Sequence, residues 1–291
     1  ELNKDKYTKD ILKHLASENV DNGSEILAAE LKMDPAEIRM KNFVPPDDFP
    51  YDTPTGLSYD SGNYAALLEK TLKLADYDQL RQNQKEARKE GRLMGIGLCT
   101  YGEICGFGPS PTLPTGGWES ATVKIEPSGH VTVMSGISSH GQGAETSFAQ
   151  ITADELGIDI EDVVVLHGDT ATVQHGVGTF GSRNTAVGGT ALVLALQELK
   201  EKIERYGAML LDSNDVAYSN GICTCNKTGK TVELSEISGA SYNANTLPPQ
   251  TQPGLVSTNY WEPPNYAFPF GAHLIVSEVD RDTGEIEIKK Y

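Results

Sequence analysis

The chain has 291 residues, of which 38% are hydrophobic and 22% are charged, and its formal net charge is −17. This composition is typical of a globular protein that is long enough to bury substantial cores. The acidic balance argues against a nucleic-acid partner, and no apolar run approaches the ~20 residues of a membrane-spanning helix. Four cysteines without metal-ligand spacing disfavour a zinc site and favour a reducing, cytoplasmic location.

Residues 1–92 are predicted to form an N-terminal helical and turn-rich segment. The charged first stretch, ELNKDKYTKD, argues against a signal peptide, and the absence of an initiator Met predicts that the chain is a fragment. The elements expected here are helices at 11–15 and 26–31 with a break at Asn22-Gly23, a helix capped by Asp34, an irregular proline-rich stretch over 45–64, and one long amphipathic helix over 64–88.

Residues 93–291 are predicted to alternate irregularly between strands and helices. Without a regular strand–helix–strand rhythm, this order favours an α+β fold with mixed sheets and packed helices. A proline-rich stretch over 245–255 is interpreted as a linker, so that 93–250 and 251–291 form separate segments. Strands are expected at 93–101, 120–126, 130–135, 162–167, 221–225, 231–234, 256–261, 271–280 and 285–289, and helices at 144–156 and 190–211.

A short glycine loop, Gly141-Gln142-Gly143, stands between a predicted strand and a predicted helix. Two glycines around one amide indicate a backbone that another group approaches closely. The start of a helix offers free N–H groups to an anion, and the Gln142 amide both donates and accepts. The alternative is a tight turn with an exposed glutamine, and the motif alone does not separate the two interpretations.

A second and richer glycine loop, HGVGTFGSRNTAVGGTA, covers residues 175–191 and also precedes a helix. Backbone N–H groups, hydroxyls and one guanidinium in this stretch would suit a pyrophosphate. The spacing is neither that of a Walker loop nor that of a dinucleotide fingerprint. An ordinary surface loop with a capping hydroxyl is the alternative, but two such loops favour one shared ligand.

The remaining polar candidates carry weaker signals. His140 borders the first glycine loop, and the sequence pairs neither Glu103 nor Glu145 with a partner that would make it a general base. His167 and His273 alternate with apolar neighbours, which is typical of histidines in strands. Cys223 and Cys225 are expected on one face of a strand.

Read together, these stretches resemble a known family. GISSHGQGAETSFAQITADELGI, DTATVQHGVGTFGSRNTAVGGTA and EPPNYAFPFGAHLIVSEVDRDTGEI are similar to the molybdopterin-binding large subunit of the xanthine oxidase and aldehyde oxidase family, the molybdenum hydroxylases. The carbon monoxide dehydrogenase branch looks nearest, because KMDPAEIRMKNFV and EICGFGPSP also match it. The resemblance runs from Ile26 to Tyr291, and residues 1–25 do not match.

The resemblance implies a role for each loop. Gln142, flanked by Gly141 and Gly143, would hydrogen-bond the molybdenum cofactor. Thr179, Ser182 and Asn184 would contact the pterin and its phosphate. Gly181, Arg183 and Thr185 would serve the dinucleotide end. The cofactor of this branch is expected to be molybdopterin cytosine dinucleotide with molybdenum.

The resemblance also implies what the chain lacks. The family's catalytic glutamate and active-site cysteine lie in segments with no match here, and Cys105 is not that cysteine. We therefore assign neither a catalytic residue nor a direct metal ligand. The expected partners are the missing segments of the large subunit, an FAD-binding subunit and an iron–sulfur subunit, in an oligomer.

Three functions follow as hypotheses. The first is the cofactor-binding portion of a molybdenum hydroxylase that is catalytically incomplete alone. The second is a non-catalytic scaffold that keeps the fold and pairs with another subunit. The third is a general nucleotide-phosphate binder that uses only the loop at 176–189.

Overall fold

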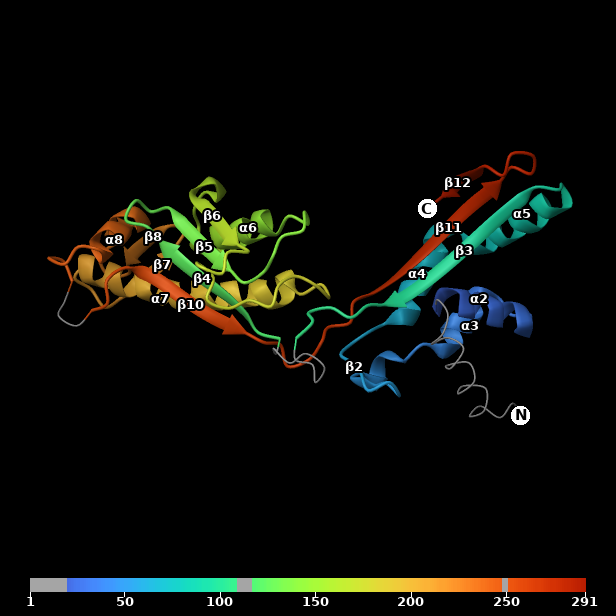
Figure 1. The fold of residues 1–291 in the computed structure, drawn as a ribbon, viewed down its shortest axis with the longest axis horizontal. Coiled ribbons are helices and arrows are strands. Elements are labelled where there is room, and N and C mark those ends of the chain that lie inside the picture. Colours follow the sequence, from blue (N-terminus) through green and yellow to red (C-terminus); the bar gives the residue numbers. More distant parts are fainter. Residues whose placement is uncertain (1–19, 109–116, 248–250) are drawn as a thin grey trace. The chain divides into compact units, whose positions relative to one another are not determined.

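The structure is a computed structural model that describes residues 20–108, 117–247 and 251–291 (Figure 1). It divides into two compact units, one made of Glu1–Glu103 with Ala267–Tyr291 and one of Ile104–Tyr266. Both units combine sheets with packed helices, which confirms the predicted α+β class. The helix expected at 11–15, most of the glycine-rich connector at 106–117, and residues 248–250 of the expected linker lie outside the described residues.

The first unit packs helices on one face of a three-stranded antiparallel sheet with the order β12-β11-β3. The alternating residues Leu98, Leu274 and Val276 face the helices and form a core with Leu68 and Tyr77. The described elements of this unit are α2 (Val20–Leu31), α3 (Pro35–Asn42), η1 (Pro46–Asp48), β1 (Tyr51–Asp52), β2 (Ser58–Tyr59), α4 (Tyr64–Ala75), α5 (Tyr77–Lys89), β3 (Leu93–Gly102), β11 (Phe270–Val279) and β12 (Ile286–Lys290).

Two predictions for this unit's helices are wrong. Asn22-Gly23 lies inside α2 instead of ending a helix. Buried Ala28 holds α2 in place, and such packing outweighs the ~1 kcal/mol that glycine costs a helix. The long helix over 64–88 is two helices, because Asp76 adopts a left-handed conformation (φ 55°) that ends α4 and begins α5.

The stretch at 45–64 also has more structure than predicted. The two-residue strands β1 and β2 pair antiparallel, with Tyr51 opposite Tyr59. A turn closes them, because Gly56 donates its N–H to the Thr53 carbonyl at 3.0 Å. The predicted helix start after Asp34 is present, since the Asp34 carboxylate accepts the Ala36 N–H at 2.8 Å.

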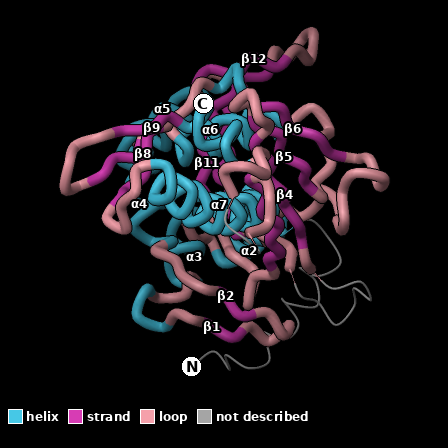
Figure 2. The backbone as a smooth tube through the Cα atoms, turned by 90° about the vertical axis from the view of Figure 1, so that its left-hand side faces the viewer, coloured by secondary structure: helices cyan, strands magenta, loops and turns pink. Residues whose placement is uncertain are grey.

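The second unit contains a four-stranded sheet with the order β10-β4-β5-β6 and a small three-stranded sheet, β7-β8-β9. β4, β5 and β6 lie side by side (Figure 2). The elements are β4 (Glu119–Ile125), β5 (Val131–Ser135), α6 (Ala144–Leu156), η2 (Ile160–Asp162), β6 (Val163–His167), η3 (Asn184–Gly189), α7 (Thr190–Leu210), β7 (Val216–Ser219), β8 (Ile222–Cys225), β9 (Thr231–Glu233), α8 (Leu234–Ser241) and β10 (Leu255–Trp261).

The core of the second unit lies between the four-stranded sheet and the helices α6 and α7. Alternate residues of β5, and of β4 from Ala121 onward, are buried, which is the period of a sheet with one covered face. They meet Phe148 of α6 and a row of leucines on α7. β5 and β6 are parallel neighbours joined through α6, so their carboxyl ends lie at one edge of the sheet.

The two units do not follow the predicted segments at 92/93 and 250/251. β10 pairs with β4 along seven residues, so the chain stays in the second unit until Tyr266. β3 and β11 pair along ten residues, which joins the chain on either side of the second unit into one sheet. Long-range strand pairing therefore sets the boundaries, and proline content does not reveal it.

Candidate functional site

Both predicted glycine loops begin at the same edge of the four-stranded sheet. The first loop follows the carboxyl end of β5 and the second follows the carboxyl end of β6, where Ser135 lies opposite His167. In sheets with parallel strands this edge is where ligands commonly bind. A cavity of about 430 Å³ lies there, lined by residues 168–170 and 173–178 together with Gly136 and Ser138.

The first loop exposes its amide and requires its glycines. Gly141 and Gly143 have positive φ angles of 95° and 76°, and a Cβ added at either position meets nothing within 4 Å. The backbone conformation thus selects glycine, and the space above both residues is open. Gln142 is exposed and turns its Oε1 to the His140 N–H at 2.5 Å. No side chain caps α6, which begins at Ala144.

Thr179 of the second loop connects the two loops. Its hydroxyl accepts the Ser138 N–H at 2.9 Å and donates to Asn184 Oδ1 at 2.5 Å. Its carbonyl lies 3.2 Å from His140 Nε2. The Asn184 Nδ2 atom is buried and has no hydrogen-bond partner within the described chain. A buried donor without an acceptor is unfavourable, so this amide is left for an acceptor outside the described residues.

The side chain of Arg183 does not occupy the position expected of a phosphate ligand. It is fully buried, and its five N–H groups meet acceptors of the protein itself. Nη1 pairs with Glu119 at 3.0 Å, and the other bonds run to four backbone carbonyls, those of Phe107, Gly117, Trp118 and Gly178. The guanidinium therefore anchors the second loop to the protein interior, and only the backbone of Arg183 remains available to a ligand.

Glu119, the first residue of β4, is the partner that the sequence did not reveal. Its Oε1 accepts the Val177 N–H at 2.7 Å, while its Oε2 faces Arg183. Burial raises the pKa of this carboxyl, and the backbone N–H of Val177 and the guanidinium of Arg183 oppose that rise. Nothing around Glu119 in the sequence distinguishes it from a surface residue at the start of a strand.

For the other predicted residues of the second loop, Gly181, Ser182 and Thr185, the structure shows mainly what the backbone does. Gly181 has φ 53°, and an added Cβ would lie 2.7 Å from the side chain of Phe107. Ser182 also has positive φ (50°), and its carbonyl accepts the Gly106 N–H at 3.2 Å. Thr185 is exposed in η3, a short π-helical turn that leads into α7. Such turns are often found at functional sites.

Glu145 and His167 form a pair that the sequence does not reveal. His167 Nε2 lies 2.7 Å from Glu145 Oε1, and the Ser139 hydroxyl donates to the other oxygen at 2.9 Å. These hydrogen bonds, with that of His167 the largest cause, lower the pKa of Glu145 to about 2. A carboxylate of that pKa is a poor proton acceptor near neutral pH, so Glu145 is not a suitable general base.

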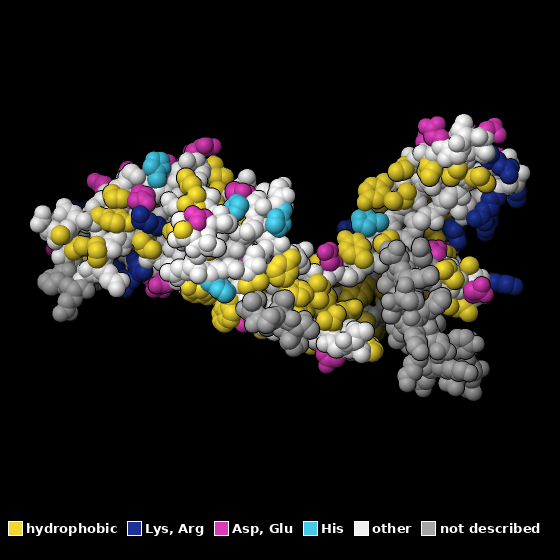
Figure 3. All heavy atoms as spheres, viewed as in Figure 1, with side chains coloured by type: hydrophobic (Ala, Val, Ile, Leu, Met, Phe, Trp, Pro, Cys, Tyr) yellow, Lys and Arg dark blue, Asp and Glu magenta, His cyan; other side chains and the backbone are white. Residues whose placement is uncertain are grey.

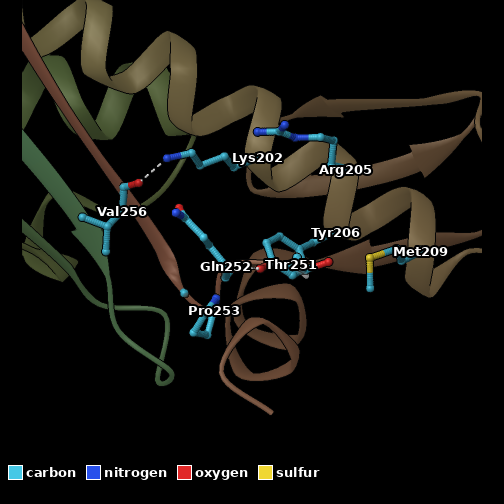
Figure 4. A pocket seen from close by; sticks show the side chains of 9 residues that line it. Lys202, Arg205, Tyr206, Met209, Thr251, Gln252, Pro253 and Val256 are labelled. Atoms are coloured by element: carbon cyan, nitrogen blue, oxygen red, sulfur yellow. Dashed lines mark hydrogen bonds between the residues drawn. The ribbon is translucent and has the colours of Figure 1, made fainter. Parts of the chain in front are cut away.

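A second cavity, of about 540 Å³, contains none of the predicted site residues (Figure 4). It lies between the second half of α7 and the segment that leads into β10, where Lys202 donates to the Val256 carbonyl at 2.5 Å and Tyr206 donates to Gln252. Within residues 20–108, 117–247 and 251–291, no group of three or more His, Cys, Asp or Glu residues is placed to hold a metal ion. In the same ranges, no helix is long and apolar enough to cross a membrane.

Comparison with known proteins agrees with the resemblance seen in the sequence. A family model described as "Molybdopterin cofactor-binding domain" matches residues 70–291. The carbon monoxide dehydrogenase large chain of Afipia carboxidovorans is 38% identical over 94% of this chain and 35% of that protein. Among solved structures, a reconstituted CO dehydrogenase from Oligotropha carboxidovorans has a TM-score of 0.82 and 38% identity over 93% of this chain and 35% of the other.

A quinoline 2-oxidoreductase from Pseudomonas putida 86 is also similar, with a TM-score of 0.79 and 31% identity over 92% of this chain and 35% of the other. The chain thus spans about a third of the length of the relatives it matches. The family match and these identities cover most of the chain, including both glycine loops. The chain therefore belongs to the xanthine oxidase family of molybdenum hydroxylases and contains a molybdopterin cofactor-binding domain.

Proposed function

We propose that this chain holds the molybdenum cofactor of a hydroxylase large chain between the loops at 138–143 and 175–185, in the form of molybdopterin cytosine dinucleotide. The single observation that carries the proposal is the link through Thr179, which joins both loops beside the unpartnered Asn184 amide. Two loops that share hydrogen bonds at one sheet edge can form the walls of one site.

The residues present fit such a group. The open space above Gly141 and Gly143 admits a flat ring close to the backbone, and the exposed Gln142 amide suits the edge of a heterocycle. The uncapped N–H groups at the start of α6 suit an anion. Thr179, Ser182 and Asn184 would face the pterin and its phosphate, and the backbone at Gly181, Arg183 and Thr185 would serve the dinucleotide end. When bound, the cofactor supplies the oxidation–reduction chemistry.

This chain alone is not expected to turn over substrate. Glu145, the carboxylate paired beside the first loop, has a pKa too low for a general base at neutral pH. The complete protein would oxidise carbon monoxide, an aldehyde or a heterocycle. It would act together with the remaining large-chain segments and with FAD-binding and iron–sulfur subunits, in the cytoplasm, where the four cysteines, none of which forms a disulfide here, would stay reduced.

The test measures molybdenum and released CMP on protein purified from a host that makes the cofactor. Gln142→Ala is expected to retain at least tenfold less of both than the unsubstituted chain, because it removes the only exposed amide of the first loop. Gln79→Ala, which removes an exposed glutamine on α5, is the matched control. Equal molybdenum content in the two variants would contradict the proposal.

A non-catalytic scaffold is the second candidate function, and one observation favours it. Ile286 and Ile288 on β12 are 67% and 64% exposed, which is typical of a surface that pairs with another polypeptide. This alternative predicts no molybdenum even after the missing segments are added. Stoichiometric molybdenum in the reconstituted protein would rule it out.

A further inference from the structure

The sheet β12-β11-β3 has one covered face and one bare face. The helices α4 and α5 cover the side that carries Leu98, Leu274 and Val276. The opposite side, which we call the outer face, is apolar instead of polar. Its large hydrophobic residues are Leu93, Tyr101, Ile275, Ile286, Ile288 and Tyr291.

The strand register places these side chains on one surface. Leu93 lies opposite Val279, which in turn lies opposite Ile286, and Ser277 lies opposite Ile288. At the other end of the outer face the imidazole of His273 is stacked between the rings of Tyr101 and Tyr291, and the Tyr291 hydroxyl is 2.9 Å from His273 Nδ1. Hydrophobic side chains gather where Figure 1 draws β12 and β11 (Figure 3).

Gly97 at the centre of β3 adds a separate observation. It is exposed on the outer face opposite Ile275, and a Cβ added there meets nothing within 4 Å. Its φ is not positive, so its own backbone does not require glycine. Glycine inside a strand costs about 0.5–1 kcal/mol and commonly marks a place where another backbone approaches closely. No described part of the first unit occupies that space.

The four-stranded sheet of the second unit shows what a solvated outer face looks like in the same chain. Its exposed side mixes Val164 and Leu166 with Lys124 and several threonines. Antiparallel sheets usually present such polar residues to water. The outer face of β12-β11-β3 lacks this polar component apart from His273 and Ser277, so it differs from an ordinary solvent-exposed face.

We propose that the outer face of β12-β11-β3 is the docking surface for the rest of the hydroxylase large chain. This inference rests on the proposed function. The matched relatives are about three times as long as this chain, so two thirds of their length is available to supply a partner surface. The partner is an apolar polypeptide surface whose backbone passes over Gly97. Because Gly97 has no side chain, the partner backbone can approach β3 closely there, and this fixes where the two surfaces meet.

The experiment mixes this chain with a polypeptide that carries the two thirds of the Afipia carboxidovorans carbon monoxide dehydrogenase large chain lying outside the aligned region. Complex formation is measured by light scattering after gel filtration, without cofactor. The unsubstituted chain is expected to form a one-to-one complex. The double variant Ile286→Lys/Ile288→Lys and the single variant Gly97→Val are expected to bind at least tenfold more weakly.

Gly97→Val keeps the test independent of folding, because valine has open space there and favours a strand. Val164→Lys/Leu166→Lys on the other sheet is the matched control and should bind within twofold of the unsubstituted chain. The proposal is overturned if the unsubstituted chain forms no complex, or if the outer-face variants bind as well as it does. A homodimer that only the outer-face variants abolish, without a heterocomplex, would also overturn it in favour of a second copy.

The two proposals fail in distinguishable ways. Gln142→Ala lies outside the outer face and should assemble normally. A complex that assembles but retains no molybdenum counts against the cofactor site alone. Retention of molybdenum without assembly counts against the docking surface alone.

Discussion

The two glycine loops differ in what holds them. The first loop exposes Gln142 above two glycines with open space around them, and it contributes few buried contacts. The second loop is fixed to the fold by a buried ion pair between Arg183 and Glu119. A ligand site needs both a rigid support and an exposed group that recognises the ligand. Here the second loop provides the support and the first loop provides the recognition group.

Removal of the buried guanidinium is expected to have the largest effect. Arg183→Met should lower the free energy of unfolding by about 3–5 kcal/mol, because it leaves the Glu119 carboxylate buried without its partner. Urea unfolding of the second unit would measure the loss. Arg183→Met/Glu119→Gln should recover part of it, and a loss below about 1 kcal/mol in the single variant would show that the pair does not support the loop.

Glycines of the two loops should respond differently to the same added methyl group. In Gly176→Ala the new Cβ would clash with the Gly136 carbonyl oxygen, so the backbone must shift, at a cost of about 1–3 kcal/mol. In Gly143→Ala the Cβ meets no atom, and only the positive φ of 76° costs about 1 kcal/mol. Thermal unfolding measures the loss of stability in both variants. A larger loss in Gly143→Ala than in Gly176→Ala would contradict the comparison.

The hydrogen bond between Glu145 and His167 beside the first loop should produce a small dependence of stability on pH. The folded-state pKa of Glu145 is lowered from 4.5 to about 2, so its stabilising contribution is complete above about pH 4.5 and is lost as the pH falls towards 2. The difference in Tm between the unsubstituted chain and Glu145→Gln should therefore shrink over that window. If this difference in Tm grew as the pH falls, folding would have to raise the pKa of Glu145 instead of lowering it.

The smallest effect on folding is expected at the recognition group itself. Gln142→Ala should change the free energy of unfolding by no more than about 0.5 kcal/mol, because the side chain is exposed. Chemical denaturation measures this change on the same samples that are analysed for molybdenum. A large loss of stability would mean that Gln142 supports the loop, and that its effect on cofactor retention is indirect.

The sequence predicted the local elements well wherever a single pattern decides them. Asp34 begins α3, the alternating residues form β4 and β5, and both glycine loops precede helices. Local patterns were misleading where packing outweighs propensity, as at Asn22-Gly23, or where one residue changes conformation, as at Asp76. A pattern of three to five residues indicates a conformational preference only. The conformations at Asn22-Gly23 and at Asp76 depend also on the structure around them.

The candidate site was predicted in part. Glycine spacing selected both loops and suggested a shared ligand, but no feature of the sequence indicated that Thr179 joins them. The sequence predicts a pyrophosphate contact for the Arg183 guanidinium, because this residue stands among the glycines and hydroxyls of the second loop. Its burial depends on Glu119, which lies 64 residues earlier in the chain. A contact over that separation leaves no periodic signal in a single sequence.

The sequence by itself determined that this is an acidic α+β chain with two glycine loops and the motifs of a molybdenum hydroxylase. These properties depend on residue type, short spacing and resemblance, which can be read from the chain without coordinates. Only the tertiary structure decided that β3 and β11 join across the second unit, that the parallel pair β5 and β6 brings the loops to one edge, and that one sheet face is left bare. Strand pairing is non-local, because its register and neighbours are fixed by burial of whole faces and not by any one segment.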